Sequence, residues 1–141
     1  MTVERDREMK IEDEMKRALL AYKSRIPSAP VQIMVPEGRN IYFFKAADIL
    51  YLQGDYDNVK LIMRRGKEKV IRGRLDRIAE LFEKHGFLRI QVSYLVNGRY
   101  ILGMDKKQVV LKGNVTFKIS PKYQKKVFEE LKVFQKEAKK E

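Results

Sequence analysis

Apolar residues near the start of the chain recur at the spacing of one face of an α-helix. Ile11, Met15, Ala18, Leu19 and Tyr22 follow one another at intervals of 4, 3, 1 and 3 residues, and charged residues fill most of the positions between them. This period is typical of an amphipathic helix. We therefore predict a helix from about residue 3 to residue 23.

The helical pattern stops at the segment 24–30, which reads SRIPSAP. A proline cannot donate a backbone hydrogen bond to a helix or to a strand ladder, so this segment interrupts both kinds of structure. We predict that residues 1–26 form an N-terminal amphipathic helix and that residues 27–30 form a linker to the main domain.

From residue 31 onward the pattern changes to short runs rich in β-branched and aromatic residues, separated by turn residues. Such runs at close spacing indicate an antiparallel sheet. Between two of them, the segment 63–67 has the composition of a hairpin turn, in which Gly66 can adopt a positive φ. The predicted strands are 31–35, 40–44, 49–53, 58–63, 68–72, 87–90, 93–97, 100–104, 109–112 and 115–120.

Two further segments have helical spacing. In residues 73–84 the apolar positions fall on one helical face, and His85 and Gly86 follow as residues suited to a helix C-terminus. Near the end of the chain, Ser120 is suited to cap a final helix and Pro121 to occupy its first position. The apolar residues of that final helix are Val127, Leu131 and Phe134.

These elements predict a mainly β fold of small antiparallel sheets with one or two short internal helices, flanked by N-terminal and C-terminal amphipathic helices. We predict a domain at 31–125 and a C-terminal helical tail at 126–141. No apolar run reaches the 18 residues of a membrane span, and the N-terminus lacks a signal-peptide pattern, so we expect a cytoplasmic protein without a membrane partner.

The composition argues against catalysis and against metal or cofactor binding. The chain has 141 residues with no Cys and a single His, which excludes disulfides, thiolate metal sites and a Cys nucleophile. That histidine, His85, is better explained as a helix-end residue. The glycines are scattered singly and form no phosphate-binding loop. We therefore expect no catalytic residues, no cofactor, no metal and no enzyme activity.

The chain carries 31 Lys and Arg against 19 Asp and Glu, a formal net charge of +12. Most of the excess lies in residues 27–120, which hold 17 basic and 9 acidic residues. Many of these basic side chains lie at turns and element ends, where they could reach the phosphates of a nucleic acid. A solvated basic surface explains the same charges equally well.

The segment 47–101 resembles the LytTR DNA-binding domain. Residues 48–58 correspond to the family's D-I-x-Y-I-E-A-D-G-N-Y segment, residues 87–97 to F-x-R-x-H-R-S-Y-L-V-N, and residues 119–123 to the P-V-S-R-R-Y-like element. The resemblance covers about residues 40–125. It implies an elongated, mainly β LytTR-like domain whose loops enter the major groove of double-stranded DNA, as in bacterial transcription regulators.

Three family positions differ here. Gln91 and Val92 stand where the family usually has His-Arg, and Pro121 stands where it usually has Arg. Glutamine can read adenine, and Val92 can contact a thymine methyl. The resemblance and these residues predict base contacts from Gln91, Lys122 and Asn58. The predicted phosphate contacts are Arg64, Arg65, Arg72, Arg89, Lys125 and Lys126.

We therefore predict a small stand-alone transcription regulator, without a receiver domain, that binds double-stranded DNA at promoter repeats. The N-terminal helix could pair with a second copy to form a homodimer, or could pack on its own domain. The main alternative function is a LytTR-fold interaction or antagonist module that has lost specific base reading. RNA or membrane-surface binding is a third possibility, for which Phe43 and Phe44 give weak support because both are better explained as strand and core.

Overall fold

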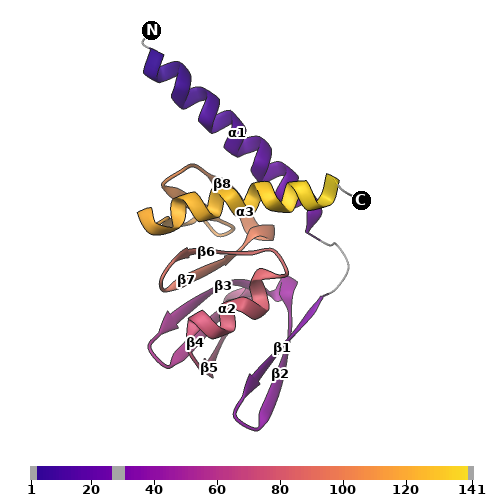
Figure 1. Ribbon diagram of the computed structural model, residues 1–141. Helices are drawn as coiled ribbons and strands as arrows, with labels where there is room; N and C mark the ends of the chain where they lie inside the picture. Colours follow the sequence, from indigo (N-terminus) through magenta and orange to yellow (C-terminus); the bar gives the residue numbers. More distant parts are fainter. Residues whose placement is uncertain (1–2, 27–30, 140–141) are drawn as a thin grey trace.

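The computed structural model describes residues 3–26 and 31–139, with side chains for residues 14–26 and 31–132. In these residues small antiparallel sheets and helices are stacked into an elongated molecule (Figure 1). A two-stranded hairpin lies at one end, a five-stranded sheet with a helix in the middle, and a three-stranded sheet with the first and last helices at the other end. The predicted linker at 27–30 lies outside the described residues.

The hairpin consists of β1 (Gln32–Glu37) and β2 (Asn40–Lys45). Alternation along these strands sends Ile33, Val35 and Phe44 into the first hydrophobic core. The opposite face is exposed, and there Met34 lies directly opposite Phe43. The expectation that Phe43 belongs to the core is therefore wrong, because the two-stranded sheet has no layer covering its outer face.

The five-stranded sheet is antiparallel throughout. Short 3₁₀ turns enter it at η1 (Ala46–Asp48) and connect two of its strands at η2 (Arg64–Gly66). In η2 Gly66 has the predicted positive φ, 72°. The strands are β3 (Ile49–Asp55), β4 (Asn58–Met63), β5 (Glu68–Arg72), β6 (Phe87–Gln91) and β7 (Tyr94–Asn97), in the order β5-β4-β3-β7-β6.

Helix α2 (Leu75–Glu83) covers one face of this sheet and buries Leu75, Ile78, Ala79 and Phe82 in the first core. It begins two residues after the predicted start at residue 73. Gly73 has a φ of 147°, and its N–H donates to the Asp57 carbonyl at 2.6 Å. That residue therefore ends the β5 connection and does not join the helix.

The other end of the molecule holds β8 (Ile101–Met104), β9 (Gln108–Leu111) and β10 (Val115–Lys118), which follow the turn η3 (Gly98–Tyr100). Helix α3 (Pro121–Lys139) packs against β6 and against α1 (Val3–Arg25). Val127 and Leu131 of α3 lie in the second hydrophobic core, whereas the Phe134 side chain lies outside the described ones. Residue 125, the predicted end of the domain, lies inside α3.

Helix α1 packs on its own chain. Ala18, Leu19 and Tyr22 belong to the second core, Met15 is also buried, and the Lys23 Nζ donates to the Ile101 carbonyl at 2.6 Å. This is one of the two arrangements that the sequence left open. The apolar stripe from residue 15 to residue 22 is therefore covered within the chain; the Ile11 side chain lies outside the described ones.

A buried asparagine connects the sheet to its entry turn. The Asn97 side-chain amide donates to the carbonyls of Ala46, at 3.0 Å, and Ile49, at 2.8 Å, and its oxygen accepts from the Arg99 N–H. These bonds use the polar groups of a side chain that is 2% exposed. With its small antiparallel sheets, internal helix and two flanking helices, the structure confirms the predicted fold class.

Candidate nucleic-acid interface

Three turns that are distant in the sequence lie together at one edge of the molecule. The Gly54 N–H, close to the end of β3, donates to the Ser93 carbonyl of the β6–β7 turn at 2.8 Å. The Ser120 N–H, just before α3, donates to the Ile90 carbonyl at 3.0 Å. We call the residues 54–58, 91–93 and 118–126 the turn cluster. It contains all three predicted base contacts.

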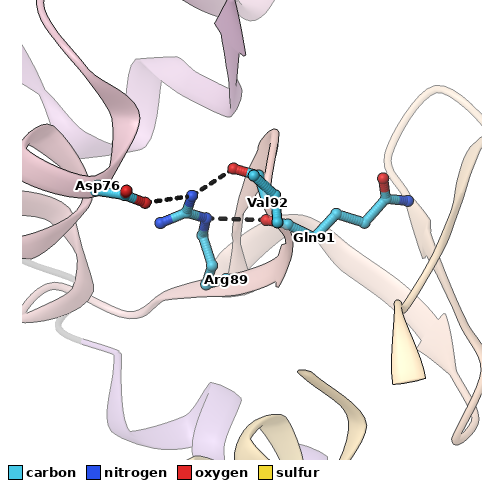
Figure 2. Close-up of polar contacts among 4 residues, drawn as sticks. All are labelled: Asp76, Arg89, Gln91 and Val92. Carbon is cyan, nitrogen blue, oxygen red and sulfur yellow. Dashed lines mark hydrogen bonds and ion pairs between the residues drawn. The ribbon is translucent and has the colours of Figure 1, made fainter. Parts of the chain in front are cut away.

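Arg89 lies behind the β6–β7 turn, and its side chain is only 7% exposed. Its Nε donates to the Gln91 carbonyl at 2.9 Å, and its Nη2 donates to the Val92 carbonyl and, at 2.9 Å, to the Asp76 carboxylate (Figure 2). A phosphate contact requires an accessible guanidinium. The guanidinium of Arg89 is instead buried and bonded inside the protein, which argues against the predicted phosphate contact.

A β-bulge in β6 makes the side chains of Arg89 and Gln91 point in different directions. Arg89 pairs with Leu95 and Gln91 pairs with the adjacent Tyr94, so β6 has one extra residue at this point. In a regular strand the two side chains would share a face. Here Arg89 points towards α2 and Gln91 extends away from it (Figure 2).

Gln91 is partly buried and reaches the three-stranded sheet. Its Nε2 donates to the Lys118 carbonyl at the end of β10, at 2.6 Å. Bidentate reading of adenine needs both the oxygen and the nitrogen of the amide. The side chain must therefore turn away from Lys118 to read adenine in this way.

Asn58 lies at the start of β4 and is exposed, opposite Asp55 in the β3–β4 pairing. Its turn also carries Asp57 and Tyr56, whose side chain is 92% exposed and whose φ is 53°. The asparagine amide is available to a base edge, while the two carboxylates repel nearby phosphates.

The first turns of α3 present lysines to solvent. Lys122 is exposed, with its Nζ 5.6 Å from the centre of the Tyr123 ring. Lys125 and Lys126 are 89% and 55% exposed, and each lies 4.0 Å from a glutamate one helical turn further on. Surface ion pairs of this kind are weak, so both ammonium groups can exchange a glutamate for a phosphate.

The remaining predicted phosphate contacts lie outside the turn cluster. Arg72 is exposed and pairs with Asn58 across β4 and β5, beside the cluster, and its N–H donates to the Glu37 carboxylate. Arg64 and Arg65 are exposed in η2, beyond the far end of β4, and that strand spans about 17 Å at the usual rise per residue. The structure therefore does not bring these two arginines to the turn cluster.

The structure adds lysines that the sequence analysis did not assign. Lys118 ends β10 directly beside Gln91. Lys106 and Lys107 occupy the β8–β9 turn, and the Lys107 carbonyl accepts from the Ile119 N–H at 2.7 Å, which places this turn against the start of α3. For Lys106 and Lys107, their position in a predicted turn was the signal that the sequence offered. The long-range pairing that groups them could not be derived from local patterns.

A cavity of about 320 Å³ lies between the β3–β4 turn, the β6–β7 turn and the start of α2. Arg74 and Arg89 line it together with Asp55 and Asp76, so its charge is mixed. Among the described residues, no group of three or more His, Asp or Glu side chains could hold a metal ion. No described helix is long and apolar enough to cross a membrane.

The chain is similar to a known protein family and to solved structures. A family profile described as the LytTr DNA-binding domain matches residues 39–132. Among solved structures, the LytTr DNA-binding domain of a Bacillus cereus protein is similar with a TM-score of 0.56 at 14% identity, covering 74% of this chain and 98% of that one. A structural similarity at this level of sequence identity shows the fold alone. The comparison with curated proteins gives no match. The profile includes the whole turn cluster and excludes α1 and β1.

Proposed function

Since the chain belongs to the LytTr DNA-binding domain family, we propose that it binds double-stranded DNA sequence-specifically as part of transcription regulation. The turn cluster enters the major groove, and the lysines around it neutralise the flanking phosphates. The net charge of +12 supports this proposal, because phosphate neutralisation supplies most non-specific affinity for DNA.

The observation that carries the proposal is the convergence of Asn58, Gln91 and Lys122 on one edge of the molecule. Asn58 begins β4, Gln91 ends β6 and Lys122 lies in the first turn of α3, and backbone hydrogen bonds join these parts of the chain. Side chains that read neighbouring base pairs must be held in a fixed relation to one another. A solvated basic surface needs no such arrangement.

We assign base reading to Gln91, Asn58 and Lys122. Phosphate contacts come from Lys125, Lys126 and Arg72, joined by the newly grouped Lys106, Lys107 and Lys118. Phosphate contacts fix the position of a protein on the duplex, whereas base contacts select the sequence. Because Arg64 and Arg65 lie at the far end of β4, we assign them to phosphates further along the duplex, reached when the long axis of the molecule follows the DNA.

The test is selection of bound DNA from a randomised duplex library at near-physiological salt, followed by sequencing. We expect an enriched motif, and two similar half-sites about one helical turn apart would indicate two copies on promoter repeats. A variant with Lys118, Lys122 and Lys125 all changed to Ala is the matched control. Recovery of unselected sequences by the unmodified protein would contradict the proposal.

Two features favour the alternative function, an interaction module that no longer reads bases. Asp55, Asp57 and Asp76 surround the β3–β4 and β6–β7 turns, and the Gln91 amide is occupied by the Lys118 carbonyl. Carboxylates beside a phosphate backbone oppose binding. If selection enriches no motif, this alternative becomes the better assignment.

A further inference from the structure

We propose that Arg89 is a positioning residue for the β6–β7 turn: it fixes the backbone that presents Gln91 and Val92 to DNA and does not touch DNA itself. The expected effect of Arg89 on base reading rests on the proposed function. The restraint of the turn does not, because it is a property of the free protein.

The first argument is the cost of burying a charge. Among the described residues only Arg89 and Asn97 are polar and buried, with Arg89 6% exposed. A buried guanidinium is tolerated only when hydrogen bonds compensate for its lost hydration. Arg89 obtains these bonds from the Gln91 and Val92 carbonyls and from Asp76, so two of its three partners belong to the turn itself.

The second argument is that the turn is held from two sides. The bulge in β6 directs Arg89 towards Asp76 of α2 (Figure 2). On the other side, the Gln91 amide donates to the Lys118 carbonyl of β10. Between these two attachments lies Val92, which is 61% exposed. The restrained turn is joined to the β3–β4 turn through the hydrogen bond from the Gly54 N–H to the Ser93 carbonyl. Restraint at Arg89 therefore extends to Asn58.

The third argument concerns the choice of side chain. A guanidinium presents several N–H groups in one rigid plane, so Nε and Nη2 can serve different carbonyls at once. The Arg89 Cζ also lies 5.9 Å from the centre of the Tyr123 ring of α3, within cation–π range. An ammonium has a single nitrogen and cannot reproduce this arrangement. The Arg89→Lys variant would therefore keep the positive charge but not this set of contacts.

The test compares Arg89→Lys and Arg89→Met with the control Arg39→Met, which changes an exposed arginine in the β1–β2 turn. In the free proteins, amide hydrogen exchange is measured at Gly54 and Ser120, which donate to Ser93 and Ile90. We expect exchange to accelerate about tenfold or more in Arg89→Met, because loss of the clamp allows local opening. Unchanged exchange would overturn the proposal. Arg89→Lys supplies the same readout if the Met variant does not fold.

Binding to the selected DNA site and to single-base variants then separates the possible roles. If Arg89 positions the turn, the Arg89 variants should discriminate between bases about tenfold less well than the wild type. The slope of their binding against salt concentration should stay the same. Retained discrimination with a slope reduced by about 1 would show a phosphate contact and overturn the proposal. If the wild type discriminates no bases, the proposed function fails, whereas the exchange data still decide whether Arg89 restrains the turn.

Discussion

The ring of Tyr22 occupies the space that a side chain at Gly98 would need. A Cβ added at Gly98 would overlap the Tyr22 ring and lie 2.7 Å from the Gly86 carbonyl oxygen. The Gly98 N–H donates to that same carbonyl at 2.8 Å. Helix α1 thus approaches the backbone after β7 closely enough to exclude every residue except glycine.

Gly98→Ala should therefore destabilise the protein by about 1 to 3 kcal/mol, since either α1 or the backbone must move to accept the methyl group. Denaturant unfolding measures the change. The matched control is Gly103→Ala, because a Cβ at Gly103 meets nothing within 4 Å. Equal effects at the two positions would show that α1 does not pack at Gly98.

Two adjacent leucines test the docking of α1 along its length. Leu19 is 8% exposed and Leu20 is 69% exposed. Leu19→Ala should cost about 2 to 5 kcal/mol through a cavity in the second core, whereas Leu20→Ala should change the free energy of unfolding by less than about 0.5 kcal/mol. Unfolding midpoints should not depend on protein concentration. If the unfolding midpoint of the wild type depended on protein concentration and that of Leu19→Ala did not, α1 would pack between two copies of the chain.

Asn97→Ala should destabilise the protein by about 3 kcal/mol, because it removes a buried amide that donates to the carbonyls of Ala46 and Ile49 and accepts from the Arg99 N–H. Thermal and denaturant unfolding both report the loss. The same substitution at exposed Asn58 is the control and should leave stability nearly unchanged. A small effect at Asn97 would show that water replaces its amide.

Glu130 of α3 should make stability depend on pH. Burial raises the pKa of Glu130 to about 6, and the nearby Glu83 adds to the rise while Lys126 opposes it. Because the folded state holds the proton more tightly, the associated stability is present below about pH 4.5 and is lost as pH rises through about 6. Glu130→Gln should therefore raise the unfolding temperature at pH 8 relative to wild type, with little change at pH 4.

The control for this prediction is Glu129→Gln, which changes the neighbouring and more exposed carboxylate of α3. We expect the unfolding temperature of this variant to stay close to that of the wild type at both pH values. An equal gain for the two variants at pH 8 would indicate a general effect of net charge on α3.

Gln91→Ala and Lys125→Ala should affect DNA binding in different ways. Loss of Gln91 should relax the preference at one base position, a discrimination worth about 1 to 3 kcal/mol. Loss of Lys125 should weaken binding to all sequences and reduce the salt slope by about 1. Titrations at several salt concentrations against the selected site and a scrambled site measure both effects. If Gln91→Ala weakened binding to all sequences and Lys125→Ala relaxed the preference at one base position, the two assigned roles would be reversed.

Local patterns were sufficient for most of the fold. Alternation and turn residues predicted the positions of the strands, and Pro36 is accommodated in β1 because this strand forms part of a two-stranded sheet with open edges. The exposure of Phe43 could not be predicted in this way, because alternation does not reveal whether a second layer covers a face.

For the candidate site, the sequence predicted which residues differ from the family but not how they are arranged. Arg89 looks like a surface arginine until its pairing with β7 reveals the bulge that turns it inward. Lys118 belongs to an ordinary strand pattern, and its position beside Gln91 depends on contact between two sheets. Bulges and contacts between sheets are set by long-range pairing, which a single sequence does not display.

The packing of α1 against α3 also governs the order in which the protein can mature on the ribosome. Residues 15–22 leave the exit tunnel before residues 123–131, yet the two segments share one hydrophobic core. Until α3 has been translated, the apolar stripe of α1 lacks part of its native partner and is a potential target for chaperones. The second core is therefore completed only after α3 has been made, although α1 precedes every strand of the three sheets in the chain.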